Sequence, residues 1–166
     1  DHTSWSENTS ARITCAAYND ASIVRMADFC ADTASDHVVL VYKNGTDIVA
    51  IKSSGTYPGT SWAWGTPTNV FTGGSGVDYY MGHIDHTADD YLIVTASRYD
   101  GTQYTSVVSN VSTNTEDTST WDGEVTVGGA TNTFAPVFSM SRGTTANGSY
   151  MVGWAEGLTL KTRYYS

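Results

Sequence analysis

Residues 38–65 read VVLVYKNGTDIVAIKSSGTYPGTSWAWG, and this stretch decides the fold that the sequence predicts. An apolar run leads to Asn44-Gly45, the dipeptide most typical of a tight β-hairpin, and a second apolar run follows it. A turn rich in Gly, Ser and Pro then ends at Ser61-Trp62, and Pro67 comes shortly after. We therefore expect two paired antiparallel strands and then a strand at a sheet edge, because proline cannot donate a ladder hydrogen bond.

The same pattern occurs twice more in the chain. Residues 91–108, YLIVTASRYDGTQYTSVV, carry a second hairpin signal at Asp100-Gly101 and lead to Thr120-Trp121, while residues 150–166 repeat the pattern up to the chain end. The tryptophans at positions 5, 62 and 121 are separated by 57 and 59 residues, and by 50 residues when counted through the two chain ends. A period near 50 with four strands per repeat is typical of a β-propeller blade.

The sequence thus predicts an all-β chain, a β-propeller of four-stranded antiparallel blades with three blades per chain. The whole chain, 1–166, is expected to form one propeller unit, with blades at 22–71 and 77–127 and with a third blade split between residues 133–166 and the outer strand at 1–18. Propellers close with about 4 to 8 blades. We therefore expect a homo-oligomer, a ring of six blades from two chains, in which the N-terminal strand completes the partner's blade or its own; an open array would be a filament.

Net charge, cysteine content and candidate glycosylation sites limit which partners and which cellular location the sequence predicts. The net charge of −9 disfavours nucleic acid, and no run approaches the roughly 18 apolar residues of a membrane span. Cys15 and Cys30 either pair, as in an exported protein, or are small core residues. Four Asn-x-Ser/Thr sequences near predicted turns are candidate glycosylation sites, and they favour an extracellular, secreted protein. Their asparagines are Asn8, Asn44, Asn110 and Asn147.

The Ser/Thr-Trp pairs carry a resemblance. Gly59, Ser61 and Trp62 match the end of the Ser-x-Asp-x-Gly-x-Ser/Thr-Trp box of sialidase-like propellers with bacterial-neuraminidase (Asp-box) repeats, although Tyr57 stands at the Asp position. Around Trp121 and Trp5 only the hydroxyl residue and the tryptophan match; the nearest preceding acids, Asp117 and Asp1, lie four residues before each tryptophan, not five. The chain thus resembles this family as a repeat architecture with degenerate boxes. Each tryptophan is expected to fill the space between blades rather than to bind a ligand.

The resemblance implies a sialidase site that this sequence does not supply. Such a site needs three arginines at the propeller axis, and Arg25 is the only arginine on an expected innermost strand. Glycosidases in general need two carboxyls about 5 to 9.5 Å apart. Glu156 is the one glutamate expected beside an aromatic side chain, Trp154, and it has no evident partner. We therefore predict no enzymatic activity and no catalytic residues, and a glycoside hydrolase is the last of three hypotheses.

Residues 81–90, MGHIDHTADD, gather imidazole and carboxylate groups that suit divalent metals, at His83, Asp85, His86, Asp89 and Asp90. Because alternate residues of a strand point to opposite faces, the two histidines need not converge. A solvated loop is the simpler interpretation. We expect no metal and no cofactor.

Carbohydrate sites combine an aromatic face with fixed hydrogen-bonding groups, and three hairpin turns offer such sets. They carry Tyr42 with Lys43 and Asp47, then Arg98, Tyr99 and Asp100, and then Trp154 with Glu156. In a propeller these turns share one end of the ring with the starts of the innermost strands. The candidate ligand-binding residues are therefore Arg25, Tyr42, Asp78, Tyr79, Tyr80, Arg98, Tyr99, Asp100, Trp154 and Glu156.

Repeated modest sites on one face suit multivalent glycan binding. The leading hypothesis is a secreted, non-enzymatic, lectin-like propeller. The alternative is a structural extracellular or virion-surface subunit that polymerises head to tail through the split blade.

Overall fold

The computed structural model describes residues 27–31, 37–55, 63–87, 89–129, 137–142 and 150–165. These residues form eleven β-strands and no helix, which confirms the all-β prediction. The part of the chain described contains no helix long and apolar enough to cross a membrane. The strands are β1 (Ala27–Ala31), β2 (Val38–Asn44), β3 (Asp47–Lys52), β4 (Thr68–Phe71), β5 (Asp78–His86), β6 (Tyr91–Tyr99), β7 (Tyr104–Thr115), β8 (Val125–Gly129), β9 (Val137–Arg142), β10 (Tyr150–Glu156) and β11 (Thr159–Tyr165).

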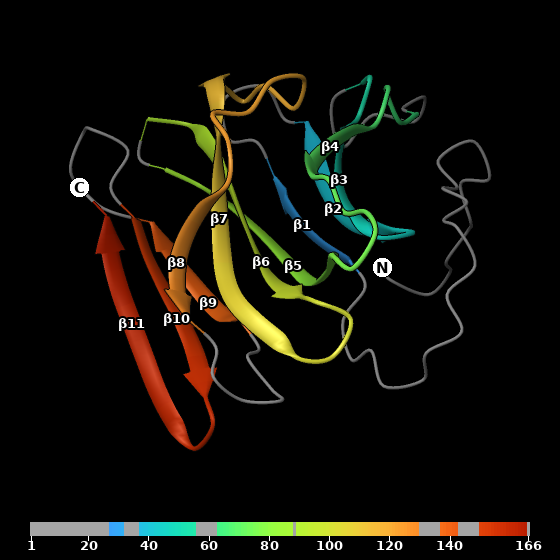
Figure 1. Ribbon diagram of the computed structural model, residues 1–166. Coiled ribbons are helices and arrows are strands. Elements are labelled where there is room, and N and C mark those ends of the chain that lie inside the picture. The colour runs from blue at the N-terminus through green and yellow to red at the C-terminus, as the bar shows by residue number, and fades with distance from the viewer. Residues whose placement is uncertain are drawn as a thin grey trace, which may run out of the picture.

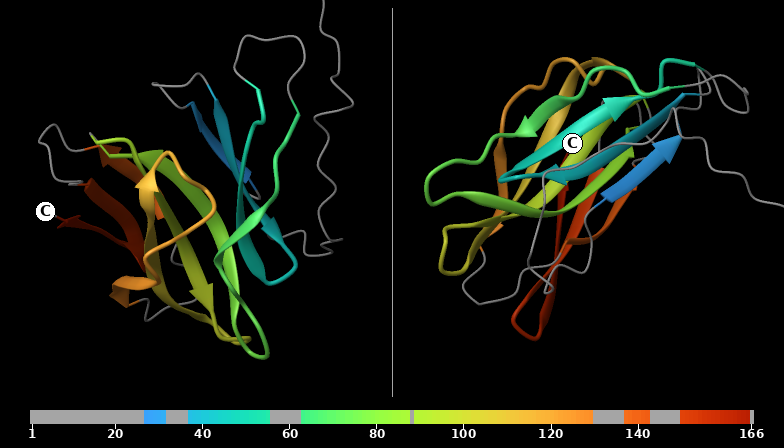
Figure 2. Two further views of the ribbon diagram at one scale, coloured as in Figure 1. Left: turned by 90° about the horizontal axis from the view of Figure 1, so that it is seen from above. Right: turned by 90° about the vertical axis from the view of Figure 1, so that its right-hand side faces the viewer.

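The strands form three antiparallel sheets in which neighbours in sequence are neighbours in space (Figure 1). The first sheet has the order β1-β2-β3-β4, the second β5-β6-β7-β8 and the third β9-β10-β11. The second sheet lies between the other two (Figure 2). Its first strand, β5, contacts β1 and β2 on one side and β9 on the other, so the first strands of successive sheets lie beside one another.

The hairpin turns lie where the sequence predicts them. Asn44 pairs with Asp47 around a two-residue turn, in which Gly45 has a φ of 62° that glycine adopts without strain. Tyr99 pairs with Tyr104 around the longer turn that contains Asp100-Gly101. In the third sheet Glu156 pairs with Thr159.

The sequence predicts fourth strands at 62–71 and 121–127, and both strands begin later than that. β4 begins at Thr68, directly after Pro67, and β8 begins at Val125 rather than at Trp121. The tryptophans instead form isolated bridges to the preceding strands: Trp64 pairs with Ser53, and Trp121 pairs with Ser112. Trp64 therefore forms the same kind of bridge as Trp121, and Trp62 lies outside the described residues.

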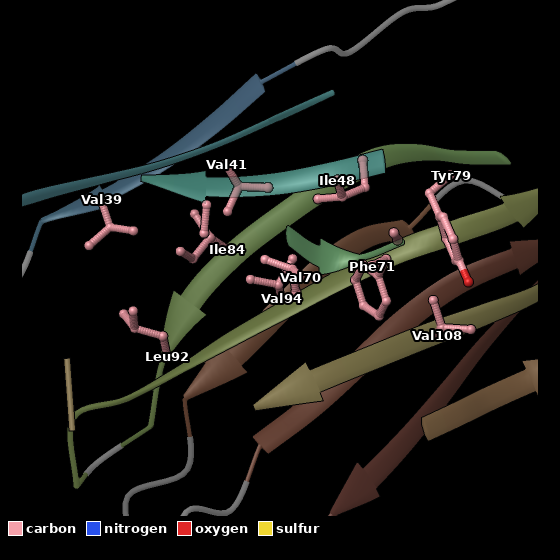
Figure 3. Close-up of a cluster of buried hydrophobic side chains, with 12 residues drawn as sticks. Val39, Val41, Ile48, Val70, Phe71, Tyr79, Ile84, Leu92, Val94 and Val108 are labelled. Carbon is pink, nitrogen blue, oxygen red and sulfur yellow. The ribbon is translucent and has the colours of Figure 1, made fainter. Parts of the chain in front are cut away.

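The main core lies between the first and second sheets (Figure 3). Alternate residues of β2 and β3, such as Val41 and Ile48, pack there against Ile84 and Val94, as the two-residue period of a strand requires. Trp121 packs against this core from its rim, as expected for a tryptophan that fills the space between sheets. A second cluster lies between the second and third sheets; it contains Ile93, Val107, Val127, Tyr150, Val152 and Trp154.

Candidate binding surface

Lys43, at the end of β2, joins the first two sheets. Its side chain is only 2% exposed, and its ammonium group pairs with Asp78 and donates to the backbone oxygen of Tyr79 at 2.8 Å. The same group lies 4.1 Å from the centroid of the Tyr80 ring, a distance at which a cation is attracted to the ring face. Burial lowers the pKa of Lys43, and the hydrogen bond and charge of Asp78 oppose this shift.

Three tyrosines of the second sheet surround this end of β5. The rings of Tyr80, Tyr99 and Tyr104 meet edge to face, with centroid distances of 5.4 to 5.8 Å. Such pairs add about 0.5 to 1.5 kcal/mol beyond the area that they bury. The tyrosine cluster therefore fixes the start of β5 and the hairpin of β6 and β7 as one unit.

Tyr79 points away from Tyr80 and meets a carboxylate. Its hydroxyl donates to Glu124, and its ring stacks on Phe71 with a centroid distance of 5.2 Å. Arg98 lies 3.7 Å from the other oxygen of Glu124. Burial, the hydrogen bond to Glu124 and its charge together raise the pKa of Tyr79. The phenol is therefore a hydrogen-bond donor throughout the physiological range.

A cavity of about 450 Å³ opens beside this pair, between β4 of the first sheet and the loop that leads into β8. We call it the β4–β8 cavity. On one side Asn69 is oriented by a 2.8 Å hydrogen bond from its amide nitrogen to Asp47. Aromatic, amide, hydroxyl and carboxylate groups thus share one opening; its lining residues are Thr68, Asn69, Val70, Phe71, Thr72, Tyr79, Asn110, Ser119, Trp121, Gly123 and Glu124.

Asn110 connects the two sides of the β4–β8 cavity. It is 3% exposed; its amide nitrogen donates to the backbone oxygen of Val70 on β4, and its amide oxygen accepts from Gly123 N, both at 2.9 Å. A glycan on Asn110 has no room in the folded chain because the amide nitrogen is buried against Val70 O, whereas Asn44 is exposed on its hairpin. Asn8 and Asn147 lie outside the described residues.

The loop before Trp121 is held by hydrogen bonds to Asp117. Asp117 accepts hydrogen bonds from the backbone nitrogen and the hydroxyl of Ser119, both at 2.8 Å, and from the hydroxyl of Thr120 at 3.2 Å. These bonds lower the pKa of Asp117. The indole nitrogen of Trp121 donates to Thr118 O at 3.2 Å. A carboxylate four residues before the tryptophan therefore orders this turn.

A second cavity, of about 550 Å³, lies beside β7; Thr87, Asp89, Tyr91, Val111, Ser112, Thr113 and Asp122 line it. Within the described ranges no three side chains of His, Cys, Asp or Glu are grouped in a way that would hold a metal ion. His83 is buried in β5, whereas His86 lies at the end of that strand, 3.4 Å from Asp85. We assign no function to this cavity.

The structure brings together five of the predicted residues: Asp78, Tyr79 and Tyr80 at the start of β5, and Arg98 and Tyr99 at the end of β6. Tyr42 lies elsewhere, because it faces the opposite side of the first sheet from Lys43 and packs with Val49 and Ile51. Asp100 lies in the exposed hairpin turn and accepts from the backbone nitrogens of Thr102 and Gln103. The bonds from Gln103 and Thr102 lower its pKa.

The predicted pair in the third sheet is set apart from the cavity. Trp154 is 5% exposed and packs between the second and third sheets. Glu156 forms an ion pair with Lys161 at 2.9 Å across its own hairpin. Arg25 and Cys15 lie outside the described residues, and Cys30 lies on β1 opposite Val39.

Several residues around the start of β5 and the β4–β8 cavity are not among the ligand residues predicted from the sequence: Lys43, Asn69, Phe71, Tyr104, Trp121 and Glu124. Lys43 had a local signal, since strand alternation places it on the opposite face from its neighbour Tyr42. Glu124 had none, because its partner Tyr79 is 45 residues away.

Comparison with protein-family models and with curated proteins finds no match to this chain.

Proposed function

We propose that the chain is a non-enzymatic carbohydrate-binding protein and that the β4–β8 cavity is its binding site. The observation that carries this proposal is the juxtaposition of Trp121 and Tyr79 with Glu124 and Asn69 around one opening. An aromatic wall accepts the C–H surface of a sugar ring, and carboxylate and amide groups accept and donate hydrogen bonds to its hydroxyls. The volume falls within the range of about 300 to 1,000 Å³ typical of ligand pockets.

The charges around the cavity favour a neutral sugar. Glu124 and Asp47 lie at or next to its wall, the chain carries a net charge of −9, and Arg98 is already close to Glu124. An acidic sugar would meet like charge, whereas a neutral hydroxyl can donate to a carboxylate and gain a charge-assisted hydrogen bond. We therefore propose neutral glycans as the ligand class.

The absence of hydrolysis is part of the proposal. Of the cavity's lining residues within the described chain, Glu124 alone carries a carboxylate, and Tyr79 already donates to it. Asp47, next to the wall, already accepts hydrogen bonds from Asn69 and from Gly73 N. Glycoside hydrolysis by the usual route requires a second carboxyl within about 9.5 Å that can act as acid or base. These contacts support recognition without bond cleavage.

For the fold, we propose a propeller similar to the sialidase-like family, in which the three sheets are blades. The sequential order of strands in each sheet and the contacts of β5 with β1 and β9 support it. Two chains would close a six-bladed ring and present two copies of the cavity, so that avidity strengthens weak single sites. We propose that the protein acts outside the cell, where Asn44 is exposed for glycosylation.

A structural role is the second candidate. The observation that favours it is the exposed outer strand of the third sheet, β11, to which a further strand could add. A structural coat subunit would elute as long polymers, whereas the proposed closed ring would have the mass of a discrete dimer.

The binding proposal is tested with an array of neutral oligosaccharides, followed by calorimetric titration of each hit. Glu124→Gln keeps the shape of the side chain and removes its charge, so we expect at least a tenfold weaker affinity. Glu156→Gln is the matched control, because it makes the same chemical change on the separate β10–β11 hairpin. An array without any hit would overturn the proposal, as would equal effects of the two substitutions.

A further inference from the structure

The side chains that line the β4–β8 cavity use their nitrogen donors for contacts within the protein. The indole nitrogen of Trp121 donates to Thr118 O at 3.2 Å, and the amide nitrogen of Asn110 donates to a backbone oxygen of β4 at 2.9 Å. Asn69 carries the remaining side-chain nitrogen of the described lining, and it donates to Asp47 at 2.8 Å. A ligand in this cavity therefore meets side-chain nitrogens that are already engaged.

Two of the hydroxyl groups in the described lining also donate to the protein itself. Tyr79 donates to Glu124, and Ser119 donates to Asp117 at 2.8 Å. The other lining hydroxyls belong to the threonines at the two ends of the β4 wall, and a threonine hydroxyl can donate or accept. The lining thus has few donors to offer, and its acceptors decide what it can recognise.

Glu124 is an acceptor with capacity left for a ligand. A carboxylate accepts at about four lone-pair positions. Tyr79 donates to Oε2, while Nη1 of Arg98 lies 3.7 Å from Oε1, beyond hydrogen-bond distance. The positive charge of Arg98 also offsets that of the carboxylate, so a neutral donor suits this position.

Asn69 is a second acceptor, because the orientation of its amide is fixed. The amide nitrogen donates to Asp47 and lies 3.4 Å from the hydroxyl of Thr72. Asp47 is itself held by Gly73 N, which donates to its other oxygen at 2.7 Å. The reverse orientation would place the amide oxygen of Asn69 against this carboxylate. Since Asn69 is exposed, its amide oxygen is the atom that a ligand can reach as an acceptor.

We propose that the β4–β8 cavity recognises sugar hydroxyls as hydrogen-bond donors, one to Glu124 and another to the amide oxygen of Asn69. The ligand class is then neutral glycans with unsubstituted hydroxyls. O-methylated and O-acylated sugars are rejected, because a substituted oxygen can no longer donate and a site built to bond a hydroxyl discriminates against its absence. The proposal rests on the carbohydrate binding proposed above and specifies which atoms of the sugar are recognised.

The donor role is tested on the unsubstituted full chain with methyl glycosides of glucose, galactose and mannose. Each is compared with analogues in which one hydroxyl at a time is replaced by hydrogen or by fluorine, and affinities are measured by NMR titration. Fluorine accepts weakly and cannot donate, so at a position recognised as a donor the fluoro analogue should bind as poorly as the deoxy analogue. At the position that meets Glu124 we expect both to bind about tenfold or more weakly than the parent sugar.

Two variants assign the positions on the sugar. In Glu124→Ala the penalty for one deoxy position should disappear, and in Asn69→Ala the penalty for a different position should disappear, because each variant lacks the acceptor that reads that hydroxyl. Glu156→Ala is the matched control; it removes a carboxylate on the β10–β11 hairpin and should retain both penalties.

Fluoro analogues that bind as well as the parent sugar, at positions where the deoxy analogues bind poorly, would overturn the proposal. The protein would then donate to those hydroxyls, and the carbohydrate-binding proposal would still stand. Penalties that stay the same in Glu124→Ala and Asn69→Ala would also overturn it, because the hydroxyls would be bound elsewhere. If neither the glycosides nor any sugar of the array binds, both proposals fail together.

Discussion

The ring of Trp154 lies against the backbone of Gly128, so closely that an added Cβ at position 128 would stand 2.4 Å from Cζ2 of the indole. This contact joins the third sheet to β8 of the second. It is reinforced by Arg163, which donates to the backbone oxygen of Val127. The third sheet therefore packs on the second through the close contact between the Gly128 backbone and the Trp154 ring.

Gly128→Ala should destabilise the chain, because the added methyl group has to displace a buried indole. Overpacking of this kind costs about 1 to 3 kcal/mol, to be measured by urea unfolding. Gly129→Ala is the matched control, since an added Cβ there meets nothing within 4 Å. Equal stabilities of the two variants would contradict the close contact between Trp154 and Gly128.

Asn110→Asp should lower the free energy of unfolding, because Asn110 connects the two sides of the β4–β8 cavity. The carboxylate cannot donate to Val70 O, and a charge would be buried at a position that is 3% exposed. A lost buried hydrogen bond of this kind costs about 1 to 3 kcal/mol. Asn44 also begins an Asn-x-Ser/Thr sequence but is exposed, so Asn44→Asp should leave the unfolding midpoint nearly unchanged. A shift of similar size in both variants would argue against the cross-sheet role of Asn110.

The alkaline limit of stability should depend on Tyr79. The pKa of its phenol is raised in the folded chain, so above a pH of about 10, where an ordinary tyrosine ionises, the unfolded chain releases a proton that the folded chain retains. This contribution to stability is fully present below that pH and is lost as pH rises toward the folded pKa. Tyr79→Phe should flatten the loss of stability between about pH 9 and 11, as followed by thermal melts. An unchanged slope would contradict the pairing with Glu124.

The acid limit should depend on Asp117. Its pKa is lowered by the hydrogen bonds of Ser119 and Thr120, so its contribution is present above a pH of about 3.9, the ordinary aspartate value, and is lost as pH falls through the folded pKa. Asp117→Asn should therefore be less stable than the unsubstituted chain at pH 7, and the difference should shrink below about pH 4. A difference that is constant with pH would show that the carboxylate charge does not order the turn.

The strands were predictable because their signals are local. Asn44-Gly45 and Asp100-Gly101 specify hairpins within a few residues, and strand alternation gives the facing of β2 and β3. The bridge of Trp64 to Ser53 was not predictable in this way, because it depends on how the turn between the third and fourth strands folds back.

The candidate site was predictable only in part, because it is assembled from distant segments. Asp78, Tyr79 and Arg98 lie close together because β5 and β6 pair antiparallel, so that the start of one strand lies beside the end of the other. The burial of Lys43 depends on Asp78, which is 35 residues away, and lysine is seldom buried without such a partner. Trp154 was selected for its type, yet its location depends on the absence of a side chain at Gly128.

The central claim, that the β4–β8 cavity binds neutral glycans, is tested most directly by the indole N–H resonances of the five tryptophans. Each resonance is assigned by single Trp→Phe substitution, and a neutral oligosaccharide from the array is titrated into ¹⁵N-labelled protein. We predict a saturable shift of the Trp121 resonance, with the buried Trp154 resonance unchanged. Saturable binding that leaves Trp121 unshifted would contradict the claim.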